Sequence, residues 1–143
     1  MYRVLIVDSG SAPTRKIASA LTESGFEVIT ASFESEGLKI ADWAFPDVII
    51  IKESSQLDGH KLCQHIRYLF DLPIILVDDK PEEEVYPTNI ENGTDWDFYM
   101  RLPISHQELV ARIKVLLRRY GKAGGVRNPI VSCSEFYFEA IQE

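Results

Sequence analysis

The feature that most constrains the fold of this sequence is a regular alternation of short apolar runs with longer amphipathic segments. The runs of strand type occupy residues 4–7, 26–31, 47–51, 73–77 and 98–100. The third run contains Val48-Ile49-Ile50-Ile51 and is apolar throughout, as in a strand with helices on both faces of its sheet. The alternation predicts a doubly wound α/β fold, a flavodoxin-like (βα)₅ sandwich with a central five-stranded parallel sheet.

The amphipathic segments have the 3.6-residue spacing of helices. Their apolar positions fall within residues 17–24, 38–43, 62–70 and 109–117. Gly25 and Pro46 are placed to end the first two helices, and Ser105 is placed to cap the last one. Residues 82–92 have a poor helix signal because Pro87 interrupts them, so we expect a short, kinked or mobile element there.

The composition is that of an ordinary globular protein, with 45% hydrophobic and 26% charged residues. The formal net charge of −7 argues against non-specific nucleic-acid binding, because an acidic surface repels phosphates. No apolar run approaches the roughly 20 residues of a membrane helix, and we expect no membrane partner. The residues after Met1 show no signal-peptide pattern, and Cys63 and Cys133 form no CxxC motif. These features predict a cytoplasmic protein.

Candidate metal ligands are not grouped in the sequence. His60, His65 and His106 lack the spacing of a zinc site. The acidic residues at 78–79 and 82–84 lack the alternating ligands and the glycine of a calcium loop. We therefore expect neither a metal nor a cofactor.

Three pieces of the chain carry a family resemblance. They are Val4–Asp8, Pro46–Ile51 with Leu57-Asp58-Gly59, and Leu102-Pro103-Ile104 with Glu108–Arg112. From residue 2 to about residue 120 the chain resembles the receiver domain of two-component response regulators. The run from Glu108 to Arg119 is most similar to that of OmpR/PhoB-type transcription factors. The resemblance implies a regulatory domain that is not itself an enzyme.

Receiver domains of this family take a phosphoryl group from a histidine kinase on an aspartate, and this sequence departs from the residues that they use. Asp8 matches the first of two acids that hold Mg²⁺, but Ser9 replaces the second. Lys52 stands at the acceptor position, Asp78 at the position of a hydroxyl residue and Leu102 at that of a lysine. The departures predict a pseudo-receiver without the usual aspartyl phosphorylation, for which a histidine kinase partner is doubtful.

Asp8, Lys52 and Asp78 should meet at the carboxyl edge of the sheet, where open α/β folds bind ligands. One hypothesis places the Lys52 ammonium where Mg²⁺ would be, paired with carboxylates. The alternative is three separate solvated side chains. Tyr99 matches the aromatic switch residue of the family, although plain packing explains it equally well.

The resemblance also implies a homodimer interface. Glu108, Arg112 and Arg119 match fifth-helix residues that form charge pairs between OmpR/PhoB-type protomers, and Asp95 and Asp97 lie where acidic partners are expected. The alternative interpretation is a set of ordinary solvated charges.

The chain is expected to divide into a receiver-like domain, residues 1–120, and a segment of different character, residues 121–143. The second segment predicts a linker followed by the first strand of a truncated winged-helix effector domain. DNA binding would occur only through that missing domain.

Two other functions remain open at this stage. The first is a signalling receiver that is phosphorylated irregularly, for example on Glu53, with Arg101 as a substitute cation. The second is a flavodoxin-like small-molecule-binding domain, in which the loop from Ser9 to Thr14 cradles a phosphate. A tight turn with a helix cap would explain that loop equally well.

Overall fold

Five parallel strands form the central sheet, in the order β2-β1-β3-β5-β6. The computed structural model describes residues 1–79, 95–120 and 126–127. In chain order the elements are β1 (Arg3–Val7), α1 (Ala12–Glu23), β2 (Glu27–Ala31), α2 (Glu34–Ala44), β3 (Val48–Lys52), α3 (Gly59–Leu69), β4 (Phe70–Asp71), β5 (Ile74–Asp78), β6 (Phe98–Arg101), α4 (His106–Tyr120) and β7 (Val126–Arg127). The predicted five-stranded parallel sheet and its doubly wound class are therefore confirmed.

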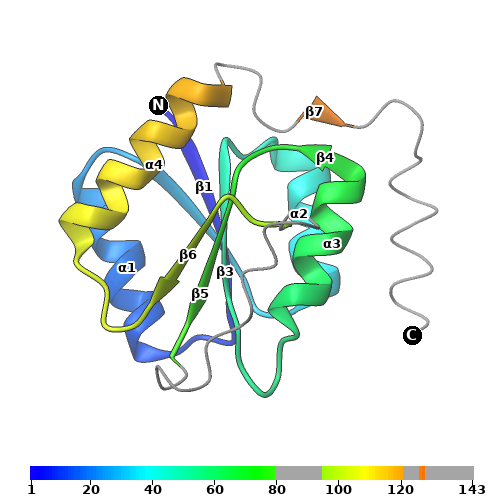
Figure 1. Cartoon of the computed structure of the whole chain (residues 1–143), viewed down its shortest axis with the longest axis horizontal. Coiled ribbons are helices and arrows are strands. Elements are labelled where there is room, and N and C mark those ends of the chain that lie inside the picture. The colour runs from blue at the N-terminus through cyan, green and yellow to red at the C-terminus, as the bar shows by residue number, and fades with distance from the viewer. Residues whose placement is uncertain (80–94, 121–125, 128–143) are drawn as a thin grey trace.

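Helices cover both faces of the sheet, with α1 and α4 on one side and α2 and α3 on the other (Figure 1). Because side chains alternate along a strand, each strand contributes to both cores. In β1, Leu5 and Val7 belong to the core under α2 and α3, whereas Val4 and Ile6 belong to the core under α1 and α4. Every residue of β3 is buried, including Lys52 at its carboxyl end.

Several predicted helix boundaries agree with the structure for identifiable reasons. Gly25 follows α1 with φ of 95°, a left-handed conformation that favours glycine. Phe45 adopts a left-handed conformation at the end of α2, directly before Pro46. The predicted cap Ser105 accepts a hydrogen bond at Oγ from the backbone N–H of Glu108, at 3.3 Å.

One small element was not expected. Phe70 and Asp71 form β4 at the end of α3, and they pair antiparallel with Arg127 and Val126 of β7. The predicted linker thus contains a two-residue strand beside β4. The short, kinked or mobile element predicted within residues 82–92 lies outside the described part of the chain, as do residues 128–143, which include the expected first strand of the effector domain. None of the described helices is long and apolar enough to cross a membrane.

Candidate functional site

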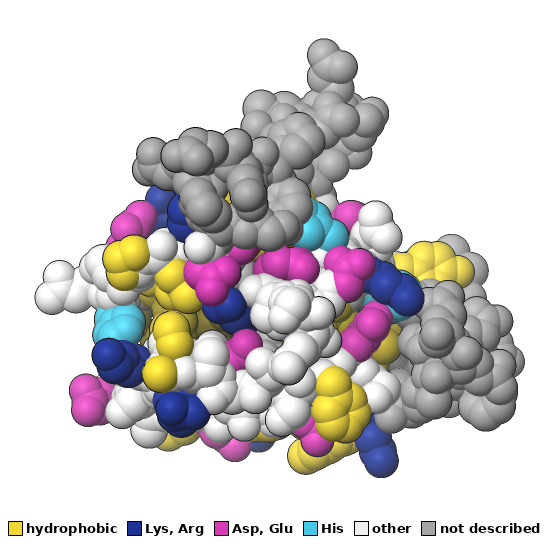
Figure 2. Space-filling view, turned by 90° about the horizontal axis from the view of Figure 1, so that it is seen from below, with side chains coloured by type: hydrophobic (Ala, Val, Ile, Leu, Met, Phe, Trp, Pro, Cys, Tyr) yellow, Lys and Arg dark blue, Asp and Glu magenta, His cyan; other side chains and the backbone are white. Residues whose placement is uncertain are grey.

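The candidate site lies at the carboxyl edge of the sheet, where β1, β3 and β5 end side by side. Asp8 follows β1, while Lys52 and Asp78 are the last residues of β3 and β5. All three residues are buried, with exposed fractions of 5%, 6% and 1%. Figure 2 shows the molecule from this end, with acidic side chains gathered near the middle of the face. The three residues thus lie at the predicted edge, but they are not three solvated side chains.

Asp8 organises the loop that leads into α1. Its Oδ2 atom accepts hydrogen bonds from the backbone N–H groups of Gly10 and Ser11, at 3.1 and 2.9 Å, and from Ser11 Oγ at 2.8 Å. Burial disfavours the charged carboxylate, but the hydrogen bonds from Ser11, Thr14 and Gly10 outweigh it and lower the pKa of Asp8. Ser9 is exposed.

These contacts bear on the proposal that the loop from Ser9 to Thr14 cradles a phosphate. The backbone N–H groups of Gly10 and Ser11, which a phosphate would need, already donate to Asp8. These two donors are therefore already paired with a carboxylate of the same chain.

Lys52 has a carboxylate partner, but this partner is Asp79 rather than Asp8 or Asp78. Its Nζ atom donates to the backbone carbonyl of Glu53 at 2.9 Å and lies 3.5 Å from Oδ2 of Asp79. The side chain of Lys52 is 7% exposed and that of Asp79 is 63% exposed, so the pair joins a buried ammonium to a solvated carboxylate.

Strand periodicity explains why Asp79, rather than Asp78, reaches Lys52. Lys52 pairs in register with Val77, so the two side chains point to the same face of the sheet. Asp79 is two residues beyond Val77 and returns to that face, whereas Asp78 points to the other. Applying the two-residue repeat to Asp78-Asp79 would have predicted this partner from the sequence.

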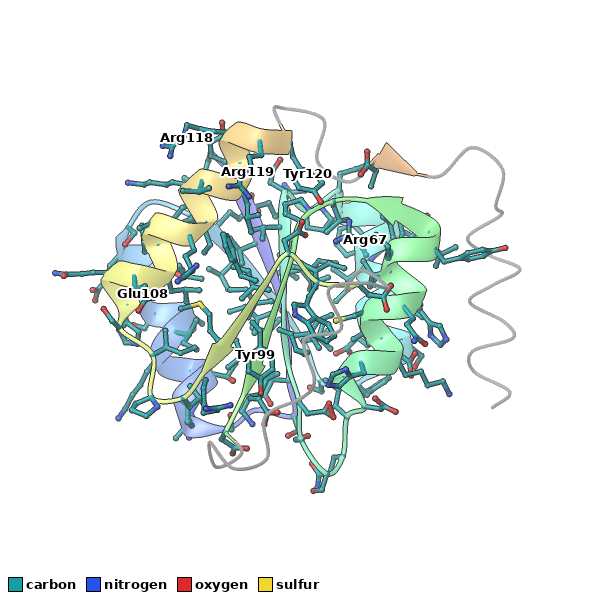
Figure 3. All side chains as sticks on the ribbon, viewed as in Figure 1. Arg67, Tyr99, Glu108, Arg118, Arg119 and Tyr120 are labelled. Carbon is teal, nitrogen blue, oxygen red and sulfur yellow. The ribbon has the colours of Figure 1, made fainter. Side chains whose placement is uncertain are left out.

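Asp78 is instead bonded to Tyr99 of β6. The Tyr99 hydroxyl donates to Oδ2 of Asp78 at 3.0 Å. Burial, together with the hydrogen bond and the negative charge of Asp78, raises the pKa of Tyr99 to about 12. Trp96 packs beside Tyr99, with ring centroids 6.2 Å apart, and makes an edge contact with His60 at 4.9 Å. The predicted switch residue is thus bonded to a carboxylate at the site, near the carboxyl end of the sheet (Figure 3).

Glu53, the alternative acceptor, is also buried. Its carboxylate accepts from the backbone N–H of Gly59, the first residue of α3, at 2.8 and 3.2 Å. The exposed fraction of Glu53 is 8%. Its carboxylate thus fixes the start of α3.

Leu102 places an apolar side chain where the family resemblance implies a cation. Its backbone N–H continues the ladder from β6 to the carbonyl of Asp78, at 2.8 Å. With Pro103, Ile104 and Ile17 it lines a cavity of about 390 Å³ beside Asp79.

The donor set does not fit the Mg²⁺ ion that the resemblance implies. Mg²⁺ requires oxygen ligands in an octahedral arrangement. Oδ2 of Asp8 is held by its own loop, Ser9 stands where the resemblance implies a second acid, and the ammonium of Lys52 adds a positive charge. An ion of charge +2 would be repelled by that ammonium at short range.

At the amino ends of the strands, opposite the candidate site, Arg67 and Asp97 connect four elements. Oδ2 of Asp97 accepts from Arg67 at 2.9 Å and from the backbone N–H of Ile74 at 2.8 Å, while Oδ1 accepts from the Tyr120 hydroxyl at 2.9 Å. Arg67 also donates to the backbone carbonyls of Leu72 and Asp95. Figure 3 shows Arg67 and Tyr120 near each other at this end. Asp97 was predicted to face a second protomer. Its hydrogen bonds instead connect α3, β5 and the start of β6 to the end of α4 within one protomer.

The predicted interface residues on α4 lie on one face of the helix. Arg112 pairs with Glu108 at 3.1 Å, and its guanidinium lies 4.7 Å from the ring centroid of Phe98 on β6. The side chain of Arg112 is 40% exposed and that of Glu108 is 54% exposed. Arg119, seven residues beyond Arg112, is exposed on the same face.

No family model matches the chain. Among curated proteins, it is 37% identical over 122 residues to the "Probable transcriptional regulator ycf27" of Guillardia theta, across 85% of this chain and 47% of the relative. It is 35% identical over 119 residues to the "Alkaline phosphatase synthesis transcriptional regulatory protein PhoP" of Bacillus subtilis, across 82% of this chain and 49% of the relative. The chain spans about half the length of the curated relatives that it matches.

Solved structures share the fold. A two-component response regulator from Clostridium difficile has a TM-score of 0.73 at 24% identity, over 85% of this chain and 100% of the other. A putative response regulator from Chloroflexus aurantiacus has a TM-score of 0.70 at 27% identity, over 82% and 98%.

Proposed function

Because this chain contains a receiver domain of the response-regulator family, related to OmpR/PhoB-type transcriptional regulators, we propose that it regulates transcription without the usual aspartyl phosphorylation. The observation that carries this proposal is the buried Lys52 ammonium at the acceptor position, held by the Glu53 carbonyl and by Asp79. An ammonium is not a nucleophile for phosphoryl transfer, and its charge replaces that of the metal. The domain is then a pseudo-receiver.

The surrounding residues support the same proposal. Phosphoryl transfer needs cations or hydrogen-bond donors around the developing charge of the transferred group. Asp78 offers a carboxylate bonded to Tyr99, and Leu102 offers an apolar side chain. Phosphorylation of Glu53 is the competing proposal, but this carboxylate is 8% exposed and bonded to the start of α3.

We further propose that the output is homodimerisation through the α4 face that carries Glu108, Arg112 and Arg119. Exposed ion pairs contribute only about 0–1 kcal/mol each, so apolar contacts beside them must carry much of the association. Both carboxylate oxygens of Asp97 are bonded within the protomer, which leaves Asp95 and Glu108 as the acidic partners of the proposed interface. Glu108 would have to exchange its pairing with Arg112 of the same helix for a cation of the second protomer. In the longer protein, a C-terminal effector domain would bind DNA, and a dimer would engage two half-sites together.

Sedimentation velocity tests this proposal directly. At tens of micromolar protein, we expect a dimer fraction that does not change when acetyl phosphate and Mg²⁺ are added. The variant Arg112→Glu should reduce the dimer fraction. The control Arg118→Glu, on another face of the same helix, should leave it unchanged. Monomer alone in the wild type, or a dimer that forms only with acetyl phosphate, would refute the proposal.

A further inference from the structure

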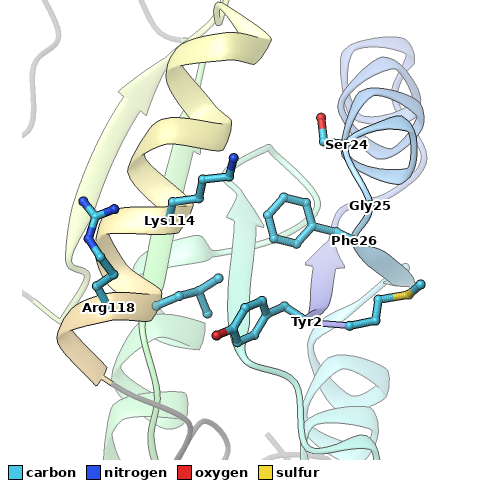
Figure 4. A pocket seen from close by; sticks show the side chains of 8 residues that line it. Tyr2, Ser24, Gly25, Phe26, Lys114 and Arg118 are labelled. Carbon is cyan, nitrogen blue, oxygen red and sulfur yellow. The ribbon is translucent and has the colours of Figure 1, made fainter.

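A second cavity lies at the amino ends of the strands, opposite the candidate site. It has a volume of about 480 Å³ and is bounded by the end of α1, the start of β2 and the C-terminal half of α4 (Figure 4). Small-molecule pockets in proteins have volumes of about 300–1,000 Å³. The cavity is therefore large enough for an organic molecule of moderate size.

The floor of this cavity is apolar and largely aromatic. Phe26 is 7% exposed and Leu117 is 6% exposed, so both are held firmly by the core under α1 and α4. Tyr2, which is 40% exposed, adds a second ring at the rim. Figure 4 shows the rings of Tyr2 and Phe26 directed toward α4. Flat apolar groups gain both burial and ring contacts against such a floor.

The wall of the cavity formed by α4 carries two cations. Lys114 and Arg118 are one helical turn apart, and both are exposed. Within residues 1–79 and 95–120, neither has an acidic side chain in ion-pair distance, in contrast to Arg112, which pairs with Glu108. Two like charges at this spacing repel each other, and an anion between them would remove that repulsion. Lys114 and Arg118 therefore form a local region of positive charge in a chain whose net charge is −7.

The end of α1 does not oppose an anion here. The carbonyls of Ala20, Leu21 and Thr22 already accept hydrogen bonds from the backbone N–H groups of residues 24–26. The negative end of that helix is therefore largely satisfied by its own chain.

We propose that this cavity binds an organic anion with a flat apolar body. Lys114 and Arg118 contact the anionic group, and Phe26, Leu117 and Tyr2 contact the body. The cavity is separate from the face of α4 that carries Glu108, Arg112 and Arg119, because residues 114 and 118 lie on a different side of the helix. The inference thus goes beyond the proposed function and does not depend on it.

Fluorescence titration of the full chain with 1-anilinonaphthalene-8-sulfonate, an aromatic sulfonate, tests this inference. The variant Lys114→Gln/Arg118→Gln removes both cations from exposed positions. The control Arg15→Gln/Lys39→Gln makes the same change of charge at exposed positions that do not line the cavity. N-phenyl-1-naphthylamine, which lacks the sulfonate, serves as the neutral probe.

We expect saturable binding of the sulfonate to the wild type and to the control, and affinity about tenfold weaker in the Lys114/Arg118 variant, because two charge-assisted contacts are lost. The neutral probe should bind all three proteins equally. Absence of saturable binding in the wild type, or equal sulfonate affinity in the two double variants, would overturn the proposal.

Discussion

The hydroxyl of Tyr99 on β6 donates a hydrogen bond to the carboxylate of Asp78 at the end of β5, at a distance of 3.0 Å. The resemblance implies that Tyr99 is at the position of the family's aromatic switch residue and that Asp78 is at the position of a hydroxyl residue. Here the two side chains are joined directly, and the hydrogen bond to Asp78 holds the Tyr99 ring at the candidate site.

This bond predicts a pH dependence of stability. The pKa of Tyr99 is raised from 10.0 to about 12 by burial and by Asp78, so the folded protein binds the phenolic proton more tightly than the unfolded chain. The stabilisation is fully present below pH 10 and is lost as the pH rises toward 12. Tyr99→Phe should lower the free energy of unfolding by about 1 kcal/mol at neutral pH.

Urea unfolding at neutral and alkaline pH measures this effect. The difference between wild type and Tyr99→Phe should shrink as the pH approaches 12. Tyr2→Phe is the matched control, because Tyr2 is 40% exposed. A difference that does not change with pH would show that the Asp78 bond is absent in solution.

A second prediction concerns Asp97. Asp97→Ala removes the acceptor of Arg67, of the Ile74 backbone N–H and of the Tyr120 hydroxyl. Leaving these donors partly unsatisfied should cost roughly 2–4 kcal/mol of unfolding free energy. The exposed Asp71 provides the control Asp71→Ala, which should cost far less. Equal urea midpoints for the two variants would contradict the role of Asp97 as a link between elements.

The third prediction concerns Mg²⁺. Isothermal titration calorimetry of the wild type should show no saturable binding at micromolar to low-millimolar Mg²⁺, because the buried Lys52 ammonium would repel the ion and Oδ2 of Asp8 is held by Ser11. Lys52→Gln should bind Mg²⁺ more strongly than the wild type, since it removes the positive charge. Saturable binding to the wild type in this range would refute the proposal that the charge of Lys52 replaces that of the metal.

Much of the fold was predictable because buried strands and amphipathic helices leave strong patterns. A strand such as β3, buried on both faces, must be apolar along its length, and Gly25 and Pro46 mark the helix ends by their backbone restrictions. The pairing of β4 with β7 had no such signal, since two residues are too few to show a period. Strand pairing between distant segments also depends on the tertiary fold rather than on either local sequence.

The candidate site was predicted less completely. The edge of the sheet that gathers Asp8, Lys52 and Asp78 follows from the order of the strands. The partner of Lys52 was missed because Asp78 and Asp79 are both acidic and only the two-residue repeat distinguishes their faces. The role of Arg67 could not be predicted, because an arginine in the last turn of an amphipathic helix has the same local pattern whether it is solvated or bonded to Asp97.

The most direct test of the central claim is the intact mass of the wild-type protein after incubation with acetyl phosphate and Mg²⁺. A receiver domain that retains its acceptor aspartate serves as the positive control. We expect no phosphoryl adduct on the wild type, and none on Lys52→Asp, because Leu102 supplies no cation and Asp79 would repel the incoming group. A stoichiometric adduct on the wild type that hydroxylamine removes, and that Glu53→Gln abolishes, would show that the chain is phosphorylated on Glu53 and would contradict the account.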